Sequence, residues 1–399
     1  MKCIVQKYGG SSVADIEKIK LIAEKIAKTK DEGYDIAVVV SAIGKTTNQL
    51  IEMAKSISPD PPKRELDMLL STGERTTMAL LCIALNELGI EAVSLTGSQA
   101  GIITNDVHND AKVIEVRPFR VQDEMEKGKV VVVGGFQGVS YRRDITTLGR
   151  GGSDTTAVAL AAALNAERCE IYSDVPGVFS ADPSIVSKAE HISEISFQQM
   201  QEMSLAGAKV MNAAAIQFAK ESNIAIYARS TFEPGKETII RKLPIGIPKG
   251  VKAVVSELEV VRIRLSGVNA DDNFKNILSF FSENQIPIKE LNYFINSGNK
   301  INISFIISYS NIYGWDKVKE QLIIMFQQFI ELEEKLSAIS LIGEGLTNNV
   351  EILDDTISYL EQYQIKIYGI TTTSFRISLL IERERIKEAV KLCHKKWLE

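Results

Sequence analysis

The sequence predicts an α/β protein, with a mainly parallel sheet sandwiched by helices, followed by a tandem βαββαβ module. Short continuous runs of Val and Ile alternate with helical patterns, and two glycine-rich loops each run into a helix pattern. Continuous apolar strands that alternate with helices are typical of a parallel sheet covered on both faces. A change of composition near residue 250, followed by two similar runs of strand and helix patterns, predicts the second module.

The first elements follow from apolar spacing. Residues 3–5 and 36–40 are uninterrupted apolar runs, which predict strands. Between them, residues 15–28 repeat apolar side chains every three or four positions, as one face of a helix requires. A long helix is expected at 66–88, with an interruption near Gly73.

The alternation continues along the chain. The all-apolar run 130–133 predicts a strand, and 155–164 predicts the helix that follows the second glycine-rich loop. Further elements are a strand at 170–173, a helix at 213–220 and a strand at 224–228. Sheets of this kind bind ligands at the carboxyl ends of their strands, where both glycine-rich loops are expected.

The domain organisation is read from a break in composition. Residues 1–243 form the first predicted domain, and 244–250, where Pro and Gly alternate, form a linker. The last repeat unit ends on a helix and lacks a strand, which 251–256 would supply. We therefore predict that a first unit at 257–335 is inserted into a second unit made of 251–256 plus 336–399.

The elements of the two units repeat the same order. In the first unit, strands are expected at 260–265, 286–295, 301–308 and 329–333, and helices at 273–281 and 315–327. In the second unit, strands are expected at 338–342, 365–371 and 374–381, and helices at 350–363 and 384–396.

Composition excludes several classes of protein. The chain has 399 residues, 45% of them hydrophobic and 24% charged, which is ordinary for a soluble protein of two or three domains. A net charge of −5 argues against a dedicated nucleic-acid binder, whose footprint is basic. The N-terminal residues do not resemble a signal peptide, and no apolar run reaches membrane-spanning length, so we expect a cytoplasmic protein without a membrane partner.

The cysteines and histidines are scattered, which argues against a disulfide framework, a zinc site or a histidine-based nucleophile. Reduced thiols fit a cytoplasmic protein. These residues are Cys3, Cys82, Cys169, Cys393, His108, His191 and His394.

The two glycine-rich loops are the strongest functional signal. Residues 7–12 read Lys-Tyr-Gly-Gly-Ser-Ser, and residues 148–154 read Leu-Gly-Arg-Gly-Gly-Ser-Asp. Glycine allows backbone N–H groups to approach a ligand closely, and a following helix N-terminus adds free donors. Either loop alone could be a tight turn, but the two together predict a polyphosphate held from two sides.

Charged residues flank both loops. Lys7 can meet phosphate oxygens as a compact cation, and the planar fork of Arg150 suits a carboxylate. Ser153 could be a simple helix cap. Asp154 could cap the helix, orient Lys7 or help to hold Mg²⁺.

Three further segments were tested. Glu74, at the glycine interruption, could bind an ammonium group or pair with its neighbouring arginine at the surface. Residues 44–46 resemble the end of a Walker A loop, but Val39 stands where its first glycine is required, so no P-loop is predicted. Residues 173–179 could hold a ribose and an adenine, or could form only a turn.

Together these segments resemble the aspartate kinases, which belong to the amino-acid kinase superfamily and carry C-terminal ACT domains. The resemblance covers nearly the whole chain and is strongest in segments 7–13, 71–75, 146–154, 173–182 and 207–210. It implies an amino-acid kinase fold and ATP-dependent phosphorylation of the β-carboxylate of L-aspartate. The product is 4-phospho-L-aspartate, on the way to lysine, methionine and threonine, and Mg²⁺ would bridge the phosphates.

The resemblance also implies roles for individual residues. Lys7 and Asp154 would be catalytic, with Asp154 positioning Lys7, and no residue is assigned as a metal ligand. The ATP-binding residues would be Lys7, Gly9, Gly10, Ser11, Ser41, Gly151, Gly152, Ser173, Asp174, Phe179, Ser184 and Lys209. The aspartate-binding residues would be Thr47, Glu74, Arg150 and Ser153.

Three positions depart from the family pattern. Ser184 stands where arginine is usual, and Asn212 stands where histidine is usual. Lys289 stands where lysine-inhibited relatives tend to have an acidic residue, so a lysine effector would meet like charge there. We also expect a homodimer joined through the ACT units, because open sheets with edge strands and apolar helices pair readily across a two-fold axis. An amino-acid effector is expected at the paired units, and its identity stays open.

Two other functions are kept beside this interpretation. One is a related kinase that acts on another carboxylate, such as N-acetylglutamate, although its blocked amino group would give Glu74 no cation to pair with. The other is a non-catalytic sensor that binds amino acids through its ACT units, which the changes at Ser184 and Asn212 favour.

Overall fold

The computed structural model describes residues 2–149, 151–208, 210–233, 235–242, 250–284, 286–296, 300–309, 312, 314–348 and 350–399. These residues fall into two compact units. Unit 1 lies within Met1–Val178, His191–Ser204 and Lys209–Ile247, and unit 2 lies within Phe179–Glu190, Leu205–Ala208 and Pro248–Glu399. Most of the predicted linker, as well as Arg150 and Lys209, lies outside the described residues. The domain limits given above therefore stay predictions.

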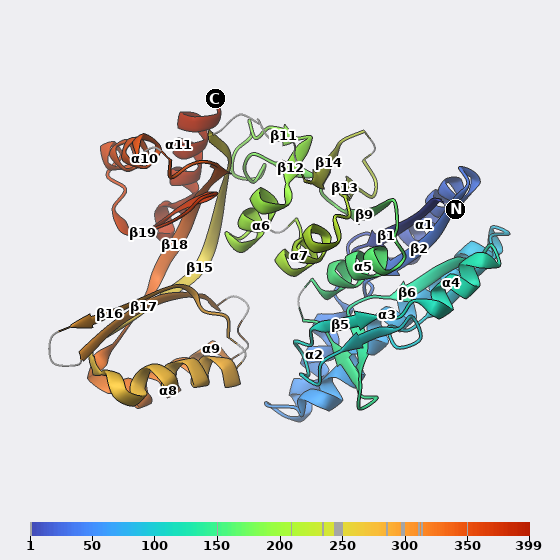
Figure 1. The fold of residues 1–399 in the computed structure, drawn as a ribbon, viewed down its shortest axis with the longest axis horizontal. Helices are drawn as coiled ribbons and strands as arrows, with labels where there is room; N and C mark the ends of the chain where they lie inside the picture. Colours follow the sequence, from blue (N-terminus) through green and yellow to red (C-terminus); the bar gives the residue numbers. More distant parts are fainter. Residues whose placement is uncertain are drawn as a thin grey trace. The chain divides into compact units, whose positions relative to one another are not determined.

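Unit 1 is built on an eight-stranded sheet with the order β12-β14-β13-β9-β1-β2-β6-β3 (Figure 1). Its pairs are parallel except for β13 and β14. The strands are β1 (Lys2–Tyr8), β2 (Tyr34–Val40), β3 (Ala92–Leu95), β6 (Val130–Gly134), β9 (Arg168–Ser173), β12 (Glu194–Ser196), β13 (Ile226–Ser230) and β14 (Glu237–Arg241). The predicted mainly parallel sheet is confirmed.

A four-stranded sheet with the order β5-β4-β7-β8 accompanies it. Its strands are β4 (Ile102–Thr104), β5 (Val113–Val116), β7 (Gln137–Ser140) and β8 (Ile145–Thr147). Two short strands, β10 (Val178–Phe179) and β11 (His191–Ile192), pair with each other. The β8 strand leads directly into the second glycine-rich loop.

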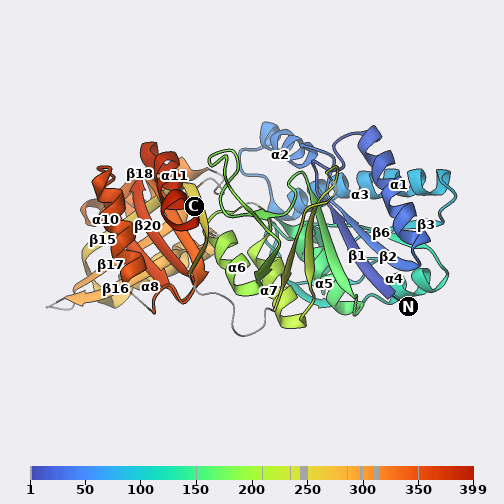
Figure 2. The same ribbon diagram turned by 90° about the horizontal axis from the view of Figure 1, so that it is seen from above.

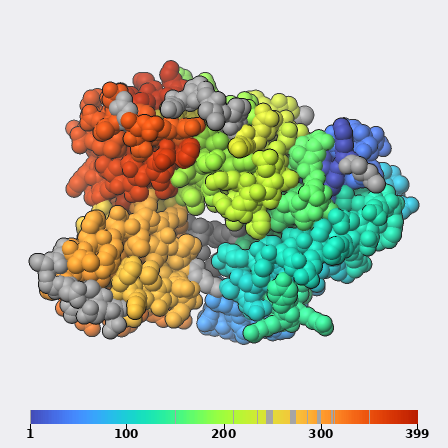
Figure 3. All heavy atoms as spheres, viewed as in Figure 1, coloured from blue at the N-terminus to red at the C-terminus, as the bar shows by residue number. Residues whose placement is uncertain are grey.

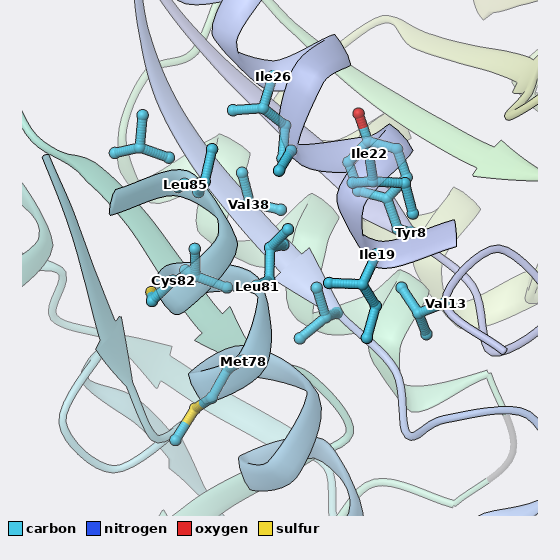
Figure 4. Packing of buried hydrophobic residues seen from close by; sticks show 14 of the residues in the cluster. Tyr8, Val13, Ile19, Ile22, Ile26, Val38, Met78, Leu81, Cys82 and Leu85 are labelled. Carbon is cyan, nitrogen blue, oxygen red and sulfur yellow. The ribbon is translucent and has the colours of Figure 1, made fainter. Parts of the chain in front are cut away.

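Helices cover both faces of the large sheet. They are α1 (Ile16–Asp31), α2 (Thr46–Ile57), α3 (Lys63–Glu87), α4 (Phe119–Glu126), α5 (Gly152–Ala163), α6 (Phe197–Leu205) and α7 (Ala213–Ser222). Helices α1 and α3 share one buried cluster with β1, β2 and β6 (Figure 4). Helix α5 contacts β1, β2 and β9 and packs against α7.

The side chains of β1 alternate between the two faces of the large sheet. Ile4 and Tyr8 enter the cluster with α1 and α3, together with Ile22 of α1 and Leu81 of α3. Because successive side chains of a strand point to opposite faces, Lys7 is on the other face. The same strand therefore contributes apolar packing on one side and a cation on the other.

Helix α3 runs without the interruption that was expected near Gly73. A Cβ atom at Gly73 would lie 2.8 Å from Cβ of Ala42, so the glycine gives the helix room against the loop after β2. The helix is 25 residues long and apolar enough to cross a membrane, contrary to the sequence reading. It packs into the core of unit 1 instead, and its buried face includes Asp67 and Glu74.

Unit 2 contains one six-stranded sheet with the order β16-β17-β15-β18-β20-β19 (Figure 2). The strands are β15 (Gly250–Asn269), β16 (Lys289–Asn296), β17 (Lys300–Ser308), β18 (Ile330–Glu344), β19 (Ile367–Thr373) and β20 (Arg376–Glu382). Its helices are α8 (Ala270–Glu283), α9 (Trp315–Phe326), α10 (Glu351–Gln362) and α11 (Ile386–Leu398). The short 3-10 helices are η2 (Gln327–Phe329) and η3 (Arg383–Arg385).

Two strands of unit 2 are longer than predicted. The runs 251–256 and 260–265 are joined in β15, and the runs 329–333 and 338–342 are joined in β18. These two strands pair antiparallel from Gly250–Glu344 to Leu265–Ile330, with register shifts between Glu257 and Arg262. A charged stretch that interrupts the apolar pattern is therefore a bulged part of one strand and not a loop.

Each half of this sheet has its own core. One cluster packs Phe281 of α8 and Leu322 of α9 against Phe305 of β17. The other packs Leu360 of α10 and Val390 of α11 against the β18 and β20 strands. The repeated strand and helix order that the sequence predicts is thus present twice around one continuous sheet.

Gly73 gives a test in which two effects have opposite signs. Alanine is favoured over glycine inside a helix by about 1 kcal/mol. Overpacking against Ala42 costs about 1–3 kcal/mol. We expect Gly73→Ala to lower the free energy of unfolding, measured by urea denaturation. Ala79→Gly, on the exposed side of α3, measures the helix term alone and should cost about 1 kcal/mol. A stabilised Gly73→Ala protein would contradict the close contact.

Candidate active site at the carboxyl ends of the strands

Four parallel strands end on one line in the middle of the sheet. Tyr8 at the end of β1 is in register with Val40 of β2 and with Tyr172 of β9, and Val40 is in register with Gly134 of β6. The first residues beyond these strand ends therefore lie along one edge of the sheet. Gly9, Ser41 and Gly135 begin three of these loops, which places the predicted ligand-binding residues side by side.

The two glycine-rich loops are joined by an ion pair. Nζ of Lys7 lies 2.7 Å from Oδ1 of Asp154, and the two side chains are only 11% and 12% exposed. Lys7 is at the end of β1, and Asp154 is in the first turn of α5. The convergence of the two loops and the pairing of their charged residues, both expected from the sequence, are therefore present.

The first loop is closed by backbone contacts. The Gly9 N–H donates to the Tyr172 carbonyl at 3.2 Å, and a Cβ atom at Gly9 would lie 3.4 Å from Nζ of Lys7. A Cβ atom at Gly10 would lie 3.1 Å from the carbonyl oxygens of both Ala42 and Gly44. Gly10 is thus favoured by its close approach to two backbone oxygens, and the absence of a side chain at Gly9 leaves room beside the lysine ammonium.

The second loop requires glycine for its backbone. Gly151, the N-cap of α5, has φ +70°, a left-handed value that favours glycine. A Cβ atom at Gly151 would lie 2.4 Å from Nδ2 of Asn212. Asn212 caps α7 by accepting the N–H of Ala214 at 2.8 Å. The residue that departs from the family pattern therefore packs directly against the loop.

Glu74 is a buried carboxylate with one oxygen satisfied. Its Oε1 accepts the Ala42 N–H at 3.1 Å, whereas Oε2 is buried and has no hydrogen-bond partner among the described residues. Burial raises the pKa of Glu74 from its ordinary 4.5 to about 7. An unsatisfied buried carboxylate oxygen is costly, and a cationic ligand would satisfy it.

The loop after β6 separates Glu74 from Ser153. A Cβ atom at Gly134 would lie 3.5 Å from Cβ of Glu74, and one at Gly135 would lie 2.8 Å from Oγ of Ser153. The glycine pair therefore allows α3 and α5 to bring these two polar side chains to the same strand end.

The other predicted residues of unit 1 are placed as follows. Thr47 is half-buried in the first turn of α2, and Ser11 is exposed in the first loop. Ser173 forms a local turn, because its Oγ accepts the Val175 N–H at 3.2 Å. Asp174 is exposed beside it. The turn interpretation of this segment is therefore present in the structure, and an ATP contact there stays a prediction.

Four of the predicted ligand-binding residues are not placed with the others at these strand ends. Phe179 and Ser184 belong to unit 2, where both N and Oγ of Ser184 donate to Oδ1 of Asp182. Arg150 and Lys209 lie outside the described residues. Their roles stay predictions.

Sequence reasoning missed two buried polar groups. Glu170 of β9 accepts from Gln6 and pairs with Arg168 and Arg229. Burial opposes ionisation of Glu170, but Arg229, Gln6 and Arg168 together outweigh it and hold the pKa of Glu170 below its ordinary value.

The second group is formed by Asp67, His108 and Thr147, although His108 had been read as isolated. Asp67 and Glu74 are seven residues apart, so they lie on the same face of α3. This spacing was the sequence signal that could have predicted a buried role for Asp67.

The described residues include no group of three or more His, Cys, Asp or Glu side chains that could hold a metal ion. Lys7 and Glu74 are the two ionisable side chains that could receive ionic groups of a ligand at these strand ends. Lys7 and the glycine amides suit a phosphate, and Glu74 suits an ammonium.

Family models match most of the chain. The model described as "Amino acid kinase family" matches residues 2–230, and the one described as "ACT domain" matches residues 339–397. The aspartokinase of Bacillus sp. strain MGA3 is 39% identical over 397 residues, which covers 99% of this chain and 97% of the relative. The aspartokinase of Mycolicibacterium smegmatis is 40% identical over 417 residues, which covers 99% and 96%.

Solved structures share the fold. Aspartokinase III of E. coli, in complex with aspartate and ADP in the R-state, has a TM-score of 0.85 at 23% identity and covers 100% of both chains. The aspartate kinase from Synechocystis is 33% identical with a TM-score of 0.57, which covers 99% of this chain and 69% of that one.

The raised pKa of Glu74 predicts a pH-dependent stability. Between pH 4.5 and 7 the folded protein binds more protons than the unfolded one, so its free energy of unfolding falls as the pH rises through this range. Above pH 7, Glu74 is ionised in both states, and the full cost of burying its charge lowers the free energy of unfolding. We expect Glu74→Gln to stabilise the ligand-free protein by up to about 3 kcal/mol near pH 8, and by under about 1 kcal/mol near pH 5.

Urea unfolding at the two pH values measures this difference. Glu17→Gln, at a side chain that is 79% exposed, is the matched control and should change stability little at either pH. An equal effect of Glu74→Gln at both pH values would contradict the raised pKa.

Proposed function

The chain belongs to the aspartokinases, within the amino acid kinase family, and we propose that the residues gathered around Lys7 and Glu74 carry its reaction. The enzyme transfers a phosphoryl group from ATP to the β-carboxylate of L-aspartate, which gives 4-phospho-L-aspartate. The observation that carries the proposal is the buried Oε2 of Glu74, which lacks a hydrogen-bond partner among the described residues, at the strand ends where Lys7 and Asp154 pair.

Lys7 supplies positive charge to the phosphoryl group. Asp154 holds the ammonium at the end of β1, so the cation is positioned before ATP binds. Charge on the transferred phosphoryl oxygens is spread over the transition state, and a fixed cation stabilises it without reorganisation. The Gly9 N–H is engaged by the Tyr172 carbonyl, and the Gly152 and Asp154 N–H groups by loop carbonyls, so the further donors proposed for the phosphate are the remaining N–H groups of the two loops.

Glu74 selects the amino acid. Its free oxygen accepts the α-ammonium of aspartate, and the loss of this partner would leave a buried carboxylate unpaired. N-acetylglutamate has no ammonium to offer, which favours aspartate over that substrate. Arg150 is proposed to bind a substrate carboxylate, with Thr47 and Ser153 beside it.

The β-carboxylate of aspartate is ionised at neutral pH, so no strong general base is needed. The reaction requires positioning and neutralisation of charge, and no covalent protein nucleophile. Mg²⁺ would be held mainly by the ATP phosphates, where it would neutralise their charge. Asp154, a carboxylate at these strand ends, is engaged by Lys7.

A non-catalytic sensor is the remaining alternative. An assay of ADP release with aspartate and Mg-ATP separates the two functions, because a correctly folded sensor would release no ADP. The same assay with N-acetylglutamate tests the other carboxylate kinase.

Regulation is proposed to act through unit 2. Lys289 of β16 pairs with Glu257 of β15, with Nζ at 2.8 Å from Oε1 and 3.0 Å from Oε2. Glu257 is thus already engaged, and the first ACT unit does not offer this carboxylate to a lysine side chain. We expect the preferred effector to have an uncharged side chain. A cytoplasmic location is proposed as well.

A homodimer through unit 2 is also proposed. The β16 strand is an edge of the six-stranded sheet, and an unpaired edge invites pairing with a second chain. Its side chains Leu291, Phe294 and Ile295 are 42%, 62% and 66% exposed. The surface of this part of unit 2 is orange in Figure 3. A two-fold axis would cover such a face in both copies.

Two substitutions should separate the roles of the site residues. We expect Lys7→Met to lower kcat about 100-fold, because the cation acts mainly on the transition state. We expect Glu74→Gln to raise the aspartate KM at least about tenfold with little change in the ATP KM. Steady-state ADP release measures both.

Lys20→Met is the matched control for the lysine, because Lys20 forms an exposed ion pair of 2.9 Å with Glu17. It should leave both constants unchanged. An aspartate KM that responds to Lys7→Met and not to Glu74→Gln would reverse the two assignments.

Light scattering tests the assembly, and a thermal-shift measurement tests the effector. We expect a dimer at micromolar concentration, and we expect Phe294→Glu to shift it towards monomer because a charge would be buried at the edge. Threonine or methionine should raise Tm more than lysine does. A monomeric native protein would refute the dimer, and the largest Tm increase with lysine would refute the effector assignment.

A further inference from the structure

We propose that Asp67, through Thr147 and His108, is a positioning residue that sets the aspartate site by fixing the second glycine-rich loop relative to α3. The inference rests on the proposed function, because it assigns the positioning of the groups that bind aspartate. Asp67 itself touches neither substrate.

Asp67 gathers three segments that are distant in the sequence. Its Oδ1 accepts the hydroxyl of Thr147 at 2.5 Å, and its Oδ2 lies 2.6 Å from Nδ1 of His108. Both oxygens also receive the Asn109 N–H, at 3.1 and 3.2 Å. The side chain is fully buried, and every donor comes from outside its own helix.

These bonds reach the loop directly. Thr147 is the last residue of β8 and stands immediately before the loop 148–154. The Thr147 carbonyl accepts the Ala111 N–H at 2.9 Å, and a Cβ atom at Gly149 would lie 2.9 Å from Oδ1 of Asp110. Asp67 therefore fixes the residue from which the loop starts. Arg150 follows Gly149 directly in the sequence.

The same helix carries the other half of the site. Asp67 and Glu74 are about two turns apart on the buried face of α3. Gln137 of β7 adds a second link between sheet and helix, because its Nε2 donates to the Ser71 carbonyl at 3.1 Å. A change at Asp67 thus alters the position of Glu74 relative to the loop that follows β8.

Stability alone does not account for a carboxylate at this place. Burying a charge is costly, and an apolar residue of similar volume is often neutral or better at a buried position. Burial raises the pKa of Asp67, and its hydrogen bonds to Thr147 and His108 oppose that shift. What the carboxylate provides is directional acceptance of three donors, and a substrate held at both ends is sensitive to displacements near 1 Å.

Two adjacent residues of β8 offer a matched comparison. Thr147 and Thr146 are both fully buried, and each hydroxyl makes one short bond, to Asp67 at 2.5 Å and to Thr104 at 2.6 Å. We expect Thr147→Val to raise the aspartate KM about tenfold, and Thr146→Val to leave it unchanged, with similar losses of Tm and an unchanged ATP KM in both. Thr147→Ser should restore the aspartate KM.

His108 allows a second test of the positioning role. Its side chain is 20% exposed, so we expect a substitution there to disturb the core little. An asparagine amide can replace Nδ1 as a donor, so His108→Asn should keep the aspartate KM and His108→Ala should raise it. Equal aspartate KM values for Thr147→Val and Thr146→Val, or for His108→Asn and His108→Ala, would overturn the positioning role.

Glu74→Gln in the same assay separates this outcome from a failure of the proposed function. A raised KM in Glu74→Gln with no response to Thr147→Val refutes only the positioning role. No response to Glu74→Gln refutes the aspartate site itself, and the positioning role with it.

Discussion

The pairing of Lys7 with Asp154 is the interaction on which the catalytic geometry depends. It joins the end of the first strand to the N-terminus of α5, across nearly 150 residues of sequence. The pair is possible because side chains alternate along β1, so that Lys7 faces α5 while Ile4 and Tyr8 pack under α1 and α3. No side chain at Gly9 crowds this buried cation, which is the proposed phosphate contact.

Two carboxylates on α3 show how environment divides roles between similar groups. Asp67 is surrounded by donors from three other residues, so its charge is satisfied by the protein. Glu74 is buried as well, yet one of its oxygens has no hydrogen-bond partner among the described residues. The first arrangement fixes structure, and the second leaves an unpaired acceptor, which is the proposed site for the ammonium of the substrate. Burial alone would not distinguish them, whereas the count of donors does.

The sequence was sufficient where local pattern decides structure. All-apolar runs located β2 and β6, and the glycine-rich segments located the loops after β1 and β8. The sequence was insufficient where a structural feature depends on a residue that is distant along the chain. Nothing local to Gly73 shows that Ala42 packs against it, and the continuity of β15 depends on β18, whose residues lie far along the chain. The partners of Asp67 are likewise 41 and 80 residues away.

Unit 2 gives amino-acid regulation a physical route along the chain. Lys289, besides its pair with Glu257, donates to the Leu205 carbonyl at 3.1 Å. A Cβ atom at Gly207 would lie 2.9 Å from the Ser256 carbonyl, so the segment Leu205–Ala208 lies against β15. This segment connects α6 to the chain that continues at Lys209, a proposed ATP contact. An effector that changed the Lys289–Glu257 pair would therefore act on a segment that adjoins Lys209 in the chain, the residue proposed to contact ATP.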